Sequence, residues 1–158
     1  MSTDDGFKER PNNFPWPPVI LVTTLALGYV LGSLFAFNLP WPPATRTFGG
    51  VLIAIALAID VAAMISLWRA KTTILPHQAS DHLVMTGIFA ISRNPIYVAN
   101  VLLIIGFGLR WENFWLFLLA PVAAMATQRL AIVREEAHLR HRFGAAYEDY
   151  CARVRRWI

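Results

Sequence analysis

The sequence predicts an all-α integral-membrane protein, a multi-pass transmembrane helical bundle with four main spans. Composition is the first reason: 56% of the 158 residues are hydrophobic and only 15% are charged, whereas about a quarter of the residues in soluble domains are charged. The mean hydropathy of +0.47 agrees with this. The second reason is that the apolar residues gather in four runs separated by prolines or charged residues. Such runs are typical of membrane spans.

Residues 1–17 are polar and rich in proline, and we expect a tail there, followed by a single integral-membrane domain over residues 18–158. The first predicted span, Pro18–Phe37, carries no charge. At about 1.5 Å per residue it is long enough to cross a hydrocarbon core of ~30 Å. It exceeds the apolar core of a secretory signal and lacks a small-residue cleavage site, which favours a retained span.

The second predicted span is Gly49–Trp68, separated from the first by a turn in which three prolines end the helix. Its one charged residue is Asp60. An unpaired carboxylate inside a membrane is costly, so Asp60 should be protonated, paired or facing a wet cavity. We expect Arg129 as its partner by depth, with a catalytic role for Asp60 as the alternative.

The third and fourth spans, Pro95–Leu109 and Phe114–Gln128, are joined by only four residues and should form an antiparallel hairpin. Residues 129–139 keep a helical pattern but become charged, which indicates that the helix leaves the membrane. The tail then has apolar residues at spacings of three and four, an amphipathic pattern formed by Phe143, Tyr147, Tyr150 and Val154. We expect this cytoplasmic helical segment to lie against the membrane face.

The positions of Lys and Arg orient the spans. Twelve of the fourteen lie in the N-terminal tail, in the loop of residues 69–94, or after residue 128. By the positive-inside rule these regions and both termini face the cytoplasm. Five of the six tryptophans lie near predicted span ends, as in an interfacial aromatic belt. The formal net charge of +4 therefore reflects topology and does not indicate nucleic-acid binding.

Covalent and metal cross-links are not predicted. Cys151 is the single cysteine, which excludes an intrachain disulfide framework. No Cys/His cluster has the spacing of a zinc site, so we predict no metal. Burial in lipid should stabilise the chain instead.

Polar residues that could carry chemistry gather near Asn94–Pro95 and at Glu135 and Glu136. Asn94 can serve as N-cap with Pro95 in the first helical position, and the free N–H groups of such a helix end bind carboxylates or phosphates. The two glutamates supply charge for a cationic ligand. Together they suit an amino-acid-like group. The structural alternative is a helix cap and a solvated pair between Glu136 and Arg140.

Several short motifs occur in a fixed order. The segment Leu83–Tyr97 contains Leu-Val-x-x-Gly, an aromatic residue and Arg-Asn-Pro-x-Tyr; Glu-Glu-x-x-Leu, Phe-Gly-x-x-Tyr-x-x-Tyr and a final Val-Arg-Arg-Trp follow. In this combination the sequence resembles the isoprenylcysteine carboxyl methyltransferase family, to which phospholipid N-methyltransferases are related. The resemblance covers residues 69–158.

The resemblance implies a membrane methyltransferase that uses S-adenosyl-L-methionine, releases S-adenosyl-L-homocysteine and encloses the cofactor between the last two helices and the C-terminal segment. Asn94 stands where many members carry histidine, and Phe89 where tyrosine is frequent. The implied cofactor-binding residues are Asp81, His82, Leu83, Val84, Phe89, Asn94, Pro95, Ile96, Tyr97, Glu135 and Glu136.

One departure concerns the acceptor. Eukaryotic members carry an arginine, implicated in holding the substrate carboxylate, one helical turn before the position of Glu135, and Ala131 stands there in this chain. We predict Glu135 and the nearby Arg129 as catalytic residues. The acceptor is expected to be lipophilic and to arrive from the bilayer: an isoprenylcysteine-like carboxylate, a thiol or a phospholipid amine. The lack of an evident base favours the carboxylate or thiolate. The alternatives are an NADPH-dependent membrane reductase of the sterol-reductase type and a non-enzymatic membrane scaffold.

Overall fold

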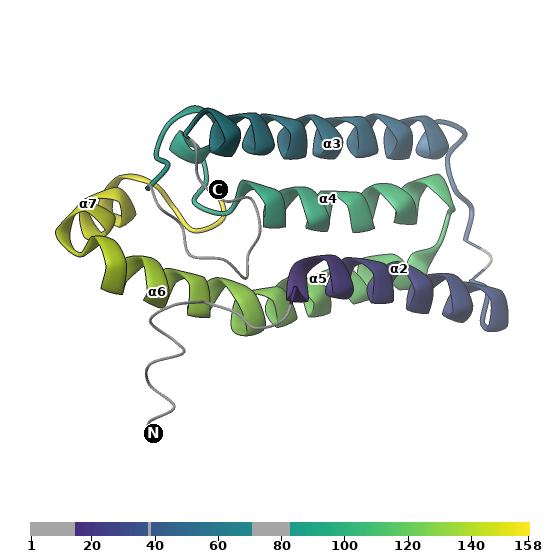
Figure 1. Cartoon of the computed structure of the whole chain (residues 1–158). Helices are drawn as coiled ribbons and strands as arrows, with labels where there is room; N and C mark the ends of the chain where they lie inside the picture. Colours follow the sequence, from purple (N-terminus) through teal and green to yellow (C-terminus); the bar gives the residue numbers. More distant parts are fainter. Residues whose placement is uncertain (1–14, 38, 71–82) are drawn as a thin grey trace, which may run out of the picture.

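The computed structural model describes residues 15–37, 39–70 and 83–158, and every regular element in these ranges is helical. The prediction of an all-α membrane bundle is confirmed (Figure 1). The elements in chain order are α2 (Trp16–Leu34), α3 (Thr45–Arg69), the short 3₁₀ helix η1 (Gly87–Ala90), α4 (Pro95–Arg110), α5 (Phe114–Thr127), the π-helix η2 (Gln128–Ile132), α6 (Val133–Phe143) and α7 (Ala145–Arg153).

The helix bounds differ slightly from the predicted ones at the first two spans. Helix α2 begins two residues before Pro18, because Pro17 occupies the first turn, where a missing N–H costs nothing. Helix α3 starts at Thr45 and is 25 residues long. Among the described residues, three helices are long and apolar enough to cross a membrane: α2, α3 and the continuous helix Phe114–Phe143. Helix α4 is a shorter apolar helix of 16 residues.

Helices α3 and α4 lie side by side over their whole length because small residues face each other (Figure 1). Gly49 of α3 lies against the backbone of α4 at Gly106 and Arg110. Further along the same contact, Ala56 and Ala99 are completely buried. Membrane helices usually associate through close packing of small residues, because lipid is as apolar as the side chains and the hydrophobic effect does not drive helices together there.

The remaining faces of the bundle are apolar and exposed, as lipid contact requires. Residues such as Val22, Phe48 and Val61 on α2 and α3 are more than half exposed in the isolated chain. A soluble protein would not present contiguous apolar helices in this way. Within these spans the side chain of Asp60 is only partly buried, and its buried Oδ1 atom has no hydrogen-bond partner among the described residues.

The fourth span continues into one long helix, as predicted. Helices α5, η2 and α6 run without interruption over residues Phe114–Phe143, about 45 Å at the usual rise and thus longer than a bilayer core. Asn113 caps the start of α5, accepting a hydrogen bond from the Trp115 N–H (3.0 Å). The charged part of the helix therefore extends beyond the apolar part toward α7 (Figure 1).

The C-terminal segment turns back over the start of α4. After α7 the backbone of Val154 is extended, and the N–H of Arg93 donates to the carbonyl of Arg155 (3.0 Å). The apolar face of α7 is covered by protein, since Tyr147 and Tyr150 are almost completely buried. We expected that face to lie against the membrane; instead these two rings pack inside the protein.

Candidate active site

Two of the predicted site residues, Tyr97 and Glu135, meet at one end of the bundle. We call this region, where α4 begins and where α6 and the C-terminal segment lie beside it, the Glu135 end. Tyr97, in the first turn of α4, donates its hydroxyl hydrogen to Oε1 of Glu135 on α6 at 2.6 Å. Tyr97 is buried and Glu135 half-buried. This contact links two segments that lie 38 residues apart in the sequence. It fixes the orientation of the Glu135 carboxylate.

Glu136 has a different environment from its neighbour. Arg156 donates to both of its carboxylate oxygens, from Nε at 2.9 Å and from Nη2 at 2.6 Å, and Arg93 Nη2 donates to Oε1 at 3.0 Å. The Glu136 side chain is only 6% exposed. The structural alternative of a solvated pair between Glu136 and Arg140 is not formed, because Arg140 pairs with Glu148 on α7. Glu136 therefore ties together three segments.

Asn94 also serves the architecture of the site. It precedes α4 as the N-cap residue, as predicted, but its side chain does not cap the helix. Its Nδ2 atom donates to the carbonyl of Arg156 at 3.0 Å, and its own N–H donates to Oγ of Ser92 at 3.1 Å. The amide is buried. Asn94 thus holds the C-terminal segment across the start of α4.

Two tyrosines of α7 close the outer side of this end. The Tyr150 hydroxyl donates to the carbonyl of Phe89 in η1 at 2.6 Å. Burial raises the pKa of Tyr150 to about 12. Burial, followed by the negative charge of Glu136, also raises the pKa of Tyr147. Both hydroxyls are therefore neutral near pH 7, and that of Tyr150 serves as a hydrogen-bond donor.

An apolar cluster lies directly beneath the polar groups. Tyr97, Ala131 and Ile132 form its buried part, and Trp16 and Trp157 pack against it. Trp157 Nε1 also donates to Oε1 of Gln128 at 3.0 Å. The Tyr97–Glu135 contact therefore lies against an apolar surface. Ala131 is completely buried here, so the position where eukaryotic relatives carry an arginine belongs to the core in this chain.

The structure brings together only part of the predicted site. Asp81 and His82 lie outside the described residues. Leu83 and Val84 are half-buried in the irregular segment before η1. The buried Pro95 and the neighbouring Ile96 begin α4 beside Tyr97.

Arg129 stands apart from this group. It lies exposed on the π-helix η2 and forms no ion pair with Asp60, so the expected pair between them is wrong. The catalytic and cofactor-binding roles predicted for Arg129 and for the other site residues stay predictions.

Sequence reasoning missed the arginines of the site. Arg93 and Arg156 both bind Glu136, and neither was assigned a role. Arg93 belongs to the motif Arg-Asn-Pro, and Arg156 belongs to the motif Val-Arg-Arg-Trp. A signal was therefore present, namely two cations near a pair of carboxylates, but spacing along the chain does not tell which cation reaches which carboxylate.

Fold and site together define a class: a helical membrane protein whose buried polar centre lies at one end of the bundle. The profile of the phospholipid methyltransferase family matches residues 44–146, more than half of the chain. The chain belongs to this family of membrane methyltransferases, and the resemblance found in the sequence is confirmed. The match includes α3 to α6 and thus both members of the Tyr97–Glu135 contact.

A second comparison finds a relative named for metal resistance. The chain is 32% identical over 150 residues to the nickel-cobalt-cadmium resistance protein NccN of Alcaligenes xylosoxydans xylosoxydans. The match covers 95% of this chain and 65% of NccN, so the chain spans about two thirds of that protein. Within the described ranges, no group of three or more His, Cys, Asp or Glu side chains is placed to hold a metal ion.

Proposed function

We propose that the protein transfers a methyl group from S-adenosylmethionine to a lipophilic acceptor at the Glu135 end of the bundle. The observation that carries this proposal is the Tyr97–Glu135 contact, which lies within the region matched by the methyltransferase family. When bound, the cofactor supplies a methyl group on a sulfonium, and its transfer to a nucleophile leaves S-adenosylhomocysteine.

The charge of the Glu135 side chain is complementary to the positive groups of this cofactor. Its methionyl part carries an ammonium, a carboxylate and the sulfonium, and Glu135 is a half-buried carboxylate that would attract the positive groups. Tyr97 orients that carboxylate through its hydroxyl. The resemblance also implicates Asn94 and Glu136. Both are hydrogen-bonded to Arg156, so in this proposal they hold the C-terminal segment in place beside the site.

The acceptor side of the proposal rests on the exposed apolar helices. A lipophilic substrate dissolved in the bilayer would approach along their surface, while a charged cofactor would arrive from water. A sulfonium methyl transfers by in-line displacement, which requires positioning and a desolvated nucleophile. An ionised carboxylate or thiolate needs no proton acceptor, whereas a protonated amine does. These acceptor classes lead to different pH dependences.

The first test is calorimetric titration of the purified protein with S-adenosylhomocysteine. Glu135→Gln should raise the Kd about tenfold, because a neutral amide loses the charge-assisted contact. The matched control is Glu148→Gln, in an exposed ion pair on α7, which should leave the Kd unchanged. No binding by the wild-type protein, or an unchanged Kd for Glu135→Gln, would contradict the proposal.

The second test identifies the acceptor. Labelled S-adenosylmethionine is supplied with phospholipid amines, thiols and prenylcysteine carboxylates in separate reactions, and label transfer is measured. Stabilisation against heat by NADPH but not by S-adenosylhomocysteine would select the reductase alternative instead. Absence of any effect of either ligand would favour a scaffold.

A further inference from the structure

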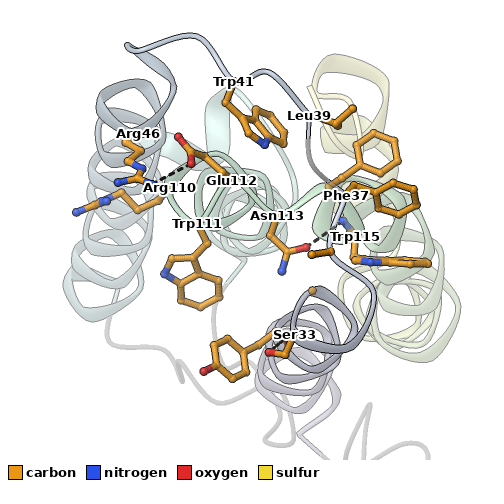
Figure 2. A pocket seen from close by; sticks show the side chains of 14 residues that line it. Ser33, Phe37, Leu39, Trp41, Arg46, Arg110, Trp111, Glu112, Asn113 and Trp115 are labelled. Carbon is orange, nitrogen blue, oxygen red and sulfur yellow. Dashed lines mark hydrogen bonds and ion pairs between the residues drawn. The ribbon is translucent and has the colours of Figure 1, made fainter.

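A pocket of about 640 Å³ lies at the end of the bundle opposite the Glu135 end. It is bounded by the ends of α2 and α4 and the starts of α3 and α5, and it shares no residue with the candidate active site (Figure 2). We call it the Arg110 pocket. It is lined by Tyr29, Gly32, Ser33, Ala36, Phe37, Leu39, Trp41, Arg46, Arg110, Trp111, Glu112, Asn113, Phe114 and Trp115.

The walls of the Arg110 pocket are held by hydrogen bonds between helices, one of them buried. Asn113 Nδ2 donates to the carbonyl of Gly28 at 2.7 Å, and Trp115 Nε1 donates to the carbonyl of Phe35 at 2.8 Å. A Cβ at Gly32 would lie 2.5 Å from Asn113 Nδ2, so α2 approaches the α4–α5 turn as closely as glycine permits. The pocket is therefore a formed feature of the fold.

Its charged groups leave one positive charge uncompensated. Arg46 Nη2 donates to Glu112 Oε2 at 2.9 Å, which neutralises both (Figure 2). Glu112 reaches Arg46 from a left-handed backbone conformation, with φ of 52°. Arg110 lines the same pocket and is exposed, and within the described part of the chain it makes no hydrogen bond or ion pair. The pocket thus carries a net charge of +1 from two arginines and one glutamate.

Six of the other lining residues are aromatic, and they lie where spans end. The Phe37 ring contacts those of Phe114 and Trp115, with centroids 5.3 Å apart in each case, and Tyr29 meets Trp111 edge-on. Tryptophan and tyrosine in this position are typical of the level of lipid headgroups. A basic pocket between helix ends at this level suits a lipid phosphate. A quaternary ammonium would be repelled by Arg110, so an aromatic cation site is disfavoured.

We propose that the Arg110 pocket binds the headgroup of an anionic glycerophospholipid. The guanidinium of Arg110 contacts the phosphate, and the aromatic residues contact the glycerol and the first acyl carbons. The site is separate from the methyl-transfer site and does not depend on it. It would hold one lipid at the membrane surface away from the Glu135 end.

The experiment is native mass spectrometry of the purified protein after incubation with phosphatidylglycerol or, separately, phosphatidylcholine. Phosphatidylglycerol should be retained in preference, and Arg110→Gln should lower its retention about tenfold, the loss of one charge-assisted contact. The matched control is Arg69→Gln, since Arg69 is also exposed at the end of a helix but at the other end of the bundle. Retention by the Arg69 variant should equal that of the wild type.

Two results would overturn this proposal. One is equal retention by the wild type and Arg110→Gln, with both proteins equally helical by circular dichroism. The other is displacement of the lipid by excess inorganic phosphate, which would make the pocket a site for a free anion. Titration of the same variant with S-adenosylhomocysteine separates this proposal from the proposed function, because Arg110→Gln should not change that Kd.

Discussion

The two adjacent glutamates, Glu135 and Glu136, show how strongly local surroundings decide what a residue can do. Glu136 is bound by Arg93 and Arg156 and is buried, so its charge is already compensated. Glu135 is half-buried and accepts a hydrogen bond from the Tyr97 hydroxyl at 2.6 Å. Two carboxylates with different hydrogen-bond partners therefore stand next to each other in the sequence.

Glu136→Gln should destabilise the protein by about 3 kcal/mol, because it leaves two arginines facing each other without a buried counter-ion. The measurement is the free energy of unfolding in detergent. Glu148→Gln breaks an ion pair whose partners are both about half exposed and should change that free energy by less than about 0.5 kcal/mol. Equal effects of the two variants would contradict the structural role assigned to Glu136.

Tyr150 should make stability depend on alkaline pH. Its pKa is raised to about 12 in the folded protein, from about 10 when unfolded, so the folded state holds the proton more tightly. The stabilisation is complete below about pH 10 and is lost as the pH rises toward 12. Tyr150→Phe should be less stable at neutral pH, having lost its bond to Phe89, but should lose less stability above pH 10.

Thermal unfolding across this pH range measures the effect. Tyr29→Phe removes an exposed tyrosine at the other end of the bundle and is the control. Parallel alkaline losses in wild type and Tyr150→Phe would show that another group is responsible.

At the scale of the elements, the α3–α4 contact depends on glycine. A Cβ at Gly49 would lie 2.5 Å from the backbone nitrogen of Arg110 and 2.7 Å from the carbonyl oxygen of Gly106, and backbone atoms cannot move aside as a side chain can. The next residue, Gly50, has nothing within 4 Å of such a Cβ. The two positions differ only in which side of α3 they occupy.

Gly49→Ala should therefore lower the unfolding temperature, whereas Gly50→Ala should leave it unchanged or raise it, since alanine favours helix by up to about 1 kcal/mol. Circular dichroism melting of both variants in one detergent compares them directly. A Gly49→Ala protein as stable as Gly50→Ala would show that α3 and α4 do not pack as described.

Elements were easier to predict from the sequence than contacts. Length, hydropathy and prolines located all four spans to within a few residues, because lipid requires long uncharged helices. The partners of Glu136 and the burial of Tyr147 could not be predicted. They depend on how the C-terminal segment folds back across α4, and hydrophobic periodicity shows which face is buried but not what buries it. Asp60 and Arg129 were paired on depth alone, which ignores the direction in which each helix face points.

At the scale of the whole molecule, the two ends of the bundle differ in chemistry. The Glu135 end combines carboxylates, arginines and the C-terminal segment, whereas the other end has the aromatic Arg110 pocket. The distribution of cations predicts that the Glu135 end faces the cytoplasm. The single cysteine, Cys151 on α7, lies near that end and can report on it.

We expect a membrane-impermeant maleimide to label Cys151 only after spheroplasts are permeabilised. In a variant that combines Cys151→Ser with Ser33→Cys, at the Arg110 pocket, labelling should occur in intact spheroplasts. Gel-shift of the labelled protein gives the readout. Labelling of Cys151 in intact spheroplasts would reverse the assigned orientation.

The π-helix η2 has a consequence for how this protein can change in evolution. A π-turn accommodates one residue more than an α-turn, so deleting one residue from Gln128–Ile132 would let α5 and α6 join as a regular α-helix. Residues beyond it would keep nearly their present direction about the helix axis, because the wide turn absorbs the extra residue. A deletion within a regular α-helix would instead rotate all that follows by about 100°. This segment can therefore lose one residue while Glu135 stays directed toward Tyr97, which a regular helix would not allow.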